Sequence, residues 1–132
     1  MDKLLKAQQE IGAIKKESNN PFFKSKYFDI NAILAEVKPI LNKHGLVLTQ
    51  TLEVIEGKNG LQTDIYDVDG GKILVTSKVL LPEGLDPQKT GSAITYFRRY
   101  ALQSLLALEA EDDDGNVASG KKVAKESEDV PF

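Results

Sequence analysis

The chain contains no cysteine and only one histidine, His44, among its 132 residues. Without cysteine there is no disulfide scaffold, no thiolate nucleophile and no cysteine-based zinc site, and a single histidine excludes a multi-histidine metal centre. The N-terminus has no long apolar stretch, so we expect neither a signal peptide nor a transmembrane helix, and a cytoplasmic protein. A Gly-rich phosphate loop and a βαβ unit are also missing, which argues against a nucleotide-binding fold.

Charge is unevenly distributed along the chain. The formal net charge is -3, but residues 1–108 carry 14 Lys and Arg against 12 Asp and Glu, whereas residues 109–132 carry 3 against 8. An acidic segment beside a basic body either contacts that body or recruits a partner, and a merely solubilising tail is the alternative. We therefore expect a folded domain over residues 1–111 and a flexible acidic tail over residues 112–132.

Helical periodicity predicts three helices. The first covers residues 2–17, and the second runs from a cap at Asp29 to about Asn42. Pro39 should kink the second helix or begin a separate final turn, and Gly45 should end it in the left-handed conformation. The third covers residues 88–110 and should pack across a sheet through a narrow apolar stripe of Ile94, Phe97, Ala101, Leu105 and Leu108.

Between the second and third helices the hydrophobic period changes to two, over residues 46–56, 61–68 and 72–81. Asp69-Gly70-Gly71 signals a tight hairpin turn, and the connection at Gly57 to Gly60 should be longer. The sequence therefore predicts an α+β domain: two N-terminal helices, a three-stranded antiparallel meander and one long helix packed on the sheet.

No set of nucleophile, base and orienting group can be assembled from this sequence. We interpret His44 as a surface residue favoured at a helix C-terminus. The acidic run of Glu109, Glu111 and Asp112 to Asp114 fails the calcium-loop spacing, which leaves weak magnesium binding or a solvated acidic stop. We expect no catalytic residue, no metal and no cofactor, and hence a protein that is not an enzyme.

The predicted third helix also has a polar face. At one hundred degrees per residue, this face separates from the apolar stripe. Hydroxyls, amides and arginine meet phosphate oxygens, and bases stack on tyrosine or guanidinium planes, so the face suits single-stranded nucleic acid; an ordinary solvated helix face is the alternative. It comprises Ser92, Thr95, Tyr96, Arg99 and Gln103.

A second basic and aromatic segment, PFFKSKY, precedes the second helix. Lys24, Lys26 and Tyr27 suit backbone neutralisation and base stacking, whereas the two phenylalanines could instead plug the core. Lys72 and Lys78 on the third strand either extend a basic track or protect a sheet edge.

These segments together carry a resemblance to a known family. NPFFKSKY before a helix, and GSAITYFRRYAL running to EDDDG, resemble the essential recombination function (Erf) family of phage single-strand annealing proteins over Asn19 to Asn116. The resemblance implies a homo-oligomeric ring or filament, in a bacterial host cytoplasm, that binds single-stranded DNA and pairs complementary strands without ATP. Its motif residues map onto Asn20, Phe22, Lys24, Ser25, Lys26 and Tyr27, and onto Gly91, Ser92, Thr95, Tyr96, Arg98, Arg99 and Tyr100.

The C-terminal sequence KESEDVPF resembles the acidic tip of bacterial single-stranded-DNA-binding proteins. Such a tip offers a partner protein one aromatic anchor, a free carboxylate and several acids. The resemblance makes Asp129, Val130, Pro131 and Phe132 a candidate partner-binding segment, and an accidental Pro-Phe end is the alternative.

The sequence favours single-strand binding and annealing in phage recombination, with DNA contacts on the loop and on the third helix, Arg98 included. The first alternative is a viral protein that coats single strands and recruits replication or repair partners through its tip. A magnesium-dependent nuclease that uses Glu109 and Asp112 to Asp114 is a second, disfavoured because a flexible carboxylate run cannot hold metal ligands in place. An adaptor without DNA contact is the third.

Overall fold

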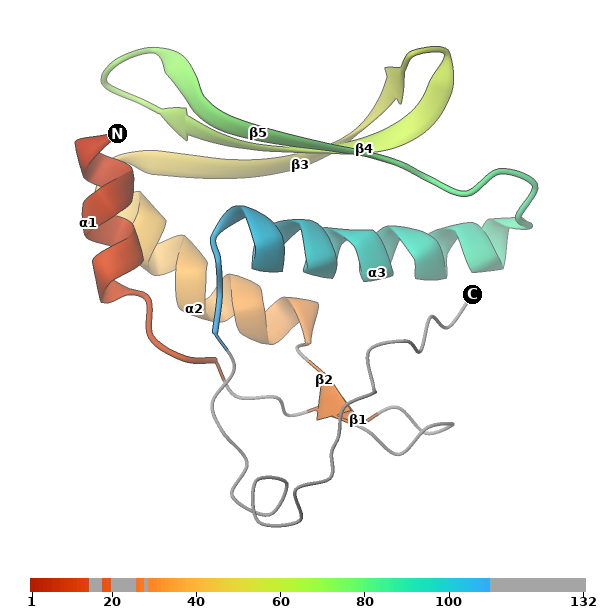
Figure 1. The fold of residues 1–132 in the computed structure, drawn as a ribbon, viewed down its shortest axis with the longest axis horizontal. Coiled ribbons are helices and arrows are strands. Elements are labelled where there is room, and N and C mark those ends of the chain that lie inside the picture. Colours follow the sequence, from red (N-terminus) through yellow and green to blue (C-terminus); the bar gives the residue numbers. More distant parts are fainter. Residues whose placement is uncertain (15–17, 20–25, 28, 110–132) are drawn as a thin grey trace.

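The computed structural model describes residues 1–14, 18–19, 26–27 and 29–109, without the side chains of 18–19 and 26–27. A three-stranded antiparallel sheet forms one layer, and helices lie against one of its faces (Figure 1). The predicted α+β class, with a meander between helices, is confirmed. The elements in order are α1 (Asp2–Glu10), β1 (Ser18–Asn19), β2 (Lys26–Tyr27), α2 (Ile30–Lys43), β3 (Leu46–Ile55), β4 (Lys58–Asp67), β5 (Lys72–Leu80) and α3 (Pro87–Leu105).

The two hairpin turns of the sheet have lengths opposite to those expected. Ile55 pairs with Lys58, so the β3–β4 turn contains only Glu56 and Gly57, both with positive φ, at 53° and 78°. This conformation belongs to the tight hairpin turns that match strand twist. In the β4–β5 connection Asp67 pairs with Lys72, which leaves four residues in the turn. The sequence prediction of the loop lengths failed because it followed the turn signals, and Asp-Gly-Gly is a stronger signal than Glu-Gly. The register of the paired strands decides the length of each loop.

Alternation along the strands separates a covered face from an open face. On β4, Leu61, Thr63 and Ile65 are buried and point toward the helices. Their neighbours Gln62, Asp64 and Tyr66 point to the opposite face, on which no described element lies (Figure 1). The open face of the sheet is therefore accessible, and the helical face carries the core.

Helix α2 follows the sequence prediction closely. The Asp29 side chain caps its first turn by accepting a hydrogen bond from the Asn31 backbone N–H at 3.4 Å. The helix is continuous through Pro39, so no separate final turn begins there. Gly45, with φ of 78°, turns the chain into β3 as expected.

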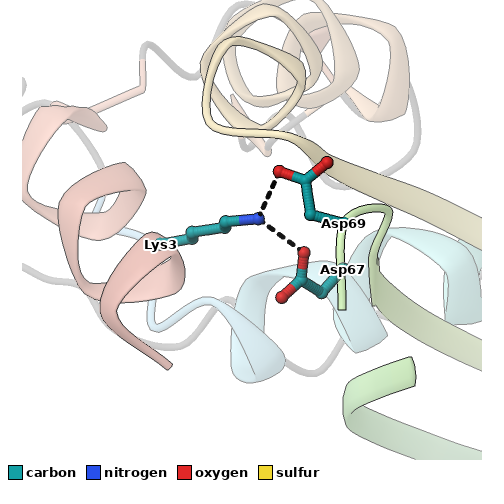
Figure 2. A network of polar contacts seen from close by, with 3 residues as sticks. All are labelled: Lys3, Asp67 and Asp69. Carbon is teal, nitrogen blue, oxygen red and sulfur yellow. Dashed lines mark hydrogen bonds and ion pairs between the residues drawn. The ribbon is translucent and has the colours of Figure 1, made fainter. Parts of the chain in front are cut away.

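Helix α1 is shorter than expected, because the chain turns extended at Ile11, and the backbone N–H of Ile14 donates to the Glu109 carbonyl at 2.8 Å. Lys3 fastens α1 to the β4–β5 hairpin: its Nζ lies 2.7 Å from Asp67 and 3.0 Å from Asp69 (Figure 2). The hydrogen bond from Lys3 holds the pKa of Asp67 below its usual value, and the two carboxylates raise the pKa of Lys3.

A second ion-pair group joins the end of α1 to the end of α2. Glu10 accepts from Lys43 Nζ at 2.7 Å and also contacts the His44 ring. The hydrogen bond from Lys43, followed by that from His44, lowers the pKa of Glu10. His44 therefore lies at the C-terminus of α2, as the sequence indicates, and its neighbour there is Glu10.

Helix α3 begins as its sequence dictates and packs differently from the prediction. Asp86 caps it by accepting from the Lys89 N–H at 2.7 Å, with Pro87 in the first turn. It ends at Leu105, well before residue 110, and Ala107 then adopts a positive φ of 52°. The expected stripe is also wrong in part, because the C-terminal half of α3 meets α2 as well as the sheet, which buries Leu102 and Leu106 on a second side.

The pairing of β1 with β2 is a feature that the sequence analysis did not anticipate. Ser18 lies opposite Tyr27 and Asn19 opposite Lys26. Two-residue strands are too short to leave a periodic signal. The predicted tail over residues 112–132 lies outside the described residues.

Candidate nucleic-acid interface

Three aromatic side chains gather on the middle of α3. The Tyr96 and Tyr100 ring centroids are 4.6 Å apart at an interplanar angle of 52°. Phe97 meets Tyr96 edge to face, with centroids 5.1 Å apart. Because such pairs are attractive and restrict ring motion, the two tyrosines form a preformed surface on one helix.

Arg99 lies over both tyrosine rings. Its guanidinium carbon is 5.4 Å from the centroid of Tyr96 and 5.2 Å from that of Tyr100, within cation–π range. The helical spacing predicts Arg99 on the polar face of α3, and in the structure the residue is only 7% exposed. A helical wheel places the Cα but does not show that a long side chain folds across rings on neighbouring turns.

Arg98 has a different neighbour, Gln50 on the helical face of the sheet. Its Nε donates to Oε1 of Gln50 at 3.3 Å, and Gln50 Nε2 donates back to the Arg98 carbonyl at 3.2 Å. The same Nε2 donates to the hydroxyl of Thr63 at 3.0 Å, and Thr63 is fully buried. The two adjacent arginines therefore have different partners. Arg99 packs on the tyrosine rings, and Arg98 is hydrogen-bonded to the sheet through Gln50.

The other predicted α3 residues lie along the same helix. Ser92 and Thr95 are exposed, and Gln103 is half-buried. Lys26 and Tyr27 lie on β2, and the structure describes their backbone but not their side chains. Lys24 and the segment Asp129, Val130, Pro131 and Phe132 lie outside the described residues, so the structure brings together only the α3 members.

A model of the ERF superfamily matches residues 1–130. The chain belongs to the ERF superfamily. This confirms the resemblance that the loop and helix motifs indicate and assigns the chain to phage recombination and single-strand annealing at the level of the family. No curated protein and no solved structure compared with this ERF chain matches it.

Gln50 of this ERF protein contacts Arg98 and Thr63, and neither Gln50 nor Thr63 was expected beside the candidate site from the sequence. In LVLTQTLEV the alternate positions Leu46, Leu48, Gln50 and Leu52 share the helical face of the sheet. A glutamine at a register position otherwise occupied by leucine is therefore the signal that could have found it, because a partly buried amide favours hydrogen-bond partners within the protein.

The described part of the ERF chain carries no group of three or more His, Cys, Asp or Glu side chains that could hold a metal. Of the acidic run named in the sequence analysis, only Glu109 falls within it, and its side chain is exposed. Nor is any described helix long and apolar enough to cross a membrane.

Proposed function

We propose that this ERF-superfamily protein binds single-stranded DNA and promotes annealing of complementary strands without ATP, as a homo-oligomer. The observation that supports the proposal best is the cluster of Tyr96, Arg99 and Tyr100 on α3. Aromatic faces stack with any base, and the half-buried Arg98 beside the cluster brings positive charge that attracts the phosphate backbone, so this part of α3 suits sequence-independent binding.

In this proposal each residue of the interface has a stated role. Arg98, Ser92 and Thr95, together with Lys24 and Lys26, contact phosphates, and Gln103 extends the polar face. Tyr96 and Tyr27 stack with bases, while Arg99 places positive charge against the tyrosine rings. Arg99 also restrains the rings, because its guanidinium lies within cation–π range of both.

Annealing follows physically, without a covalent step. Bases held by stacking keep their Watson–Crick edges available to a second strand, and stacking in the duplex product drives pairing. Since residues 1–108 are nearly neutral, each protomer binds weakly, and affinity comes from several protomers on one strand. No catalytic group, metal or cofactor is required.

A direct test measures the annealing rate of two complementary oligonucleotides labelled for energy transfer, with and without the protein, in the absence of ATP and magnesium. Tyr96→Leu removes the ring and keeps apolar volume, and we expect about 1–3 kcal/mol weaker binding for each stacked base lost. Tyr66→Leu on the open sheet face is the matched control, and both rate and affinity should stay near the wild-type values.

Each outcome of this test has a clear meaning. Strong acceleration by the wild type, reduced by Tyr96→Leu alone, supports the proposal. Strands that are bound and intact but not annealed faster would favour the coating protein that recruits partners through Asp129, Val130, Pro131 and Phe132. Magnesium-dependent cleavage would favour the nuclease.

A further inference from the structure

The two outer strands of the sheet both present a long unpaired edge. β3 has ten residues and β5 has nine, and each pairs only with β4 among the described strands. A row of unpaired backbone N–H and C=O groups is a template for a further strand, and proteins either protect it or use it. The sheet thus has two edges of nearly equal length.

The two edges carry charges of opposite sign. The only charged residue of β3 is Glu53, and the only charged residues of β5 are Lys72 and Lys78. Glu53 and Lys78 are exposed, and neither forms an ion pair within the described residues. Opposite edges of two copies therefore attract each other, whereas like edges repel.

The two edges start in the same register. Asp67 of β4 pairs with both Leu46 and Lys72, so β3 and β5 begin on the same row and run parallel, although β5 carries one extra residue, Leu74, in a bulge between the rows of Tyr66 and Ile65. A second copy placed beside the first in the same orientation continues these rows. Its Val47 lies next to Ile73, and its Leu52 lies next to Val79.

Charges and exposed aliphatic side chains meet under this alignment. Lys78 shares a row with Thr51, so it lies diagonally from Glu53 of the second copy, within reach of a long side chain. Leu52 is 60% exposed and Val54 is 73% exposed, although both face the helical side of the sheet. The neighbouring copy would cover these two residues, which the helices of their own chain leave open.

We propose that β3 of one copy pairs in parallel with β5 of the next, head to tail, so that one sheet continues through the assembly. Such an interface uses two different surfaces, and it produces a ring if the rotation closes and a filament if it does not. It deepens the proposed function by naming the surface behind the homo-oligomer, and it places α3 of successive copies on one side of the shared sheet.

Charge-reversal variants test this interface in the full chain. Glu53→Lys and Lys78→Glu each place like charges across the contact, and we expect at least tenfold weaker association for either alone, measured by sedimentation and light scattering. An equimolar mixture of the two variants should reassemble. In the mixture the introduced lysine of one variant meets the introduced glutamate of the other, and the unchanged Glu53 meets the unchanged Lys78, at alternating contacts. Recovery on mixing cannot arise from two misfolded proteins.

Several results would overturn the interface. These are a wild type that stays monomeric, single variants that assemble like the wild type, and a mixture that does not recover. If Lys78 only protects the sheet edge from pairing, Lys78→Glu should leave the state of assembly unchanged. That result would contradict the proposal as well.

The interface and the proposed function can fail separately. The single variants leave α3 unchanged, so they should bind an oligonucleotide of about six nucleotides as a wild-type protomer does, within the site size of one protomer. An assembled wild type that neither binds nor anneals DNA would contradict the proposed function and leave the interface in place.

Discussion

The two faces of the three-stranded sheet have different surroundings, although their residues alternate along the same strands. On the helical face, Ile65 is fully buried among residues of α2 and α3. On the open face Ile73, the same residue type one strand away, is 49% exposed. One face is thus committed to folding, and the other remains available for contacts.

Polar groups follow the same division. On the helical face, Gln50 is held by Thr63 and Arg98 and links β3 to α3. On the open face, Gln62 and Thr76 both donate to Asp64, within reach of water. We therefore expect a polar residue in this sheet to contribute more to stability where its partner is buried, as Thr63 is, than where water can replace that partner.

The largest expected effect comes from removing side-chain volume on the covered face. Ile65→Ala should lower the free energy of unfolding by about 2–5 kcal/mol, because it leaves a cavity among packed side chains. Ile73→Ala is the matched control, and we expect a loss below about 1 kcal/mol. Urea denaturation of monomeric protein measures both, and equal losses would break the comparison between the faces.

The second effect concerns the covered amide. Gln50→Leu removes the donor to buried Thr63 and to the Arg98 carbonyl, and we expect a loss of about 1–3 kcal/mol in the free energy of unfolding. Gln62→Leu makes the same change on the open face and should stay within about 0.5 kcal/mol of wild type. A larger loss for Gln62→Leu than for Gln50→Leu would contradict the division.

A smaller, pH-dependent effect is expected where α1 meets the end of the sheet. Because Lys3 lowers the pKa of Asp67, this carboxylate stabilises the fold above its usual pKa of 3.8, and the contribution is lost as the pH falls through the lower folded value. The raised pKa of Lys3 has the opposite sign: its contribution is complete below 10.5 and is lost as the pH rises through the higher folded value.

Unfolding measured across pH checks this contact. The stability difference between wild type and Asp67→Asn should be largest near neutrality and should shrink in acid. Asp69→Asn, at the longer and more exposed contact, should lose less. A difference that does not change between pH 2 and pH 7 would show that the carboxylate charge of Asp67 is not the cause.

Much of this fold could be predicted from the sequence, and the reasons are local. A two-residue period marks each strand of the meander, and Asp29 and Gly45 mark the ends of α2. The apolar stripe of α3 was predicted only in part, because a helix that packs against both a sheet and another helix buries more than one side. Leu102 shows this, since it is buried yet lies outside the expected stripe.

The candidate site was predictable in composition but not in geometry. The motif residues on α3 pointed to single-stranded DNA, and spacing placed Tyr96 and Arg99 on one face. Spacing could not show that Arg99 packs over the rings of Tyr96 and Tyr100, or that Arg98 is hydrogen-bonded to Gln50, because the partners of a long side chain depend on the tertiary structure.

The smallest effect tests what keeps the two faces distinct. A shift of one residue in the pairing of β3 with β4 would exchange every covered side chain for an open one, so the turn that sets the register matters to both faces. Glu56 adopts a left-handed conformation there, which asparagine tolerates better. We therefore expect Glu56→Asn to raise the free energy of unfolding by about 0.5 kcal/mol. Gly57→Ala, at φ of 78°, should lower it by more than about 1 kcal/mol, and a stabilising Gly57→Ala would contradict the left-handed conformation of this turn.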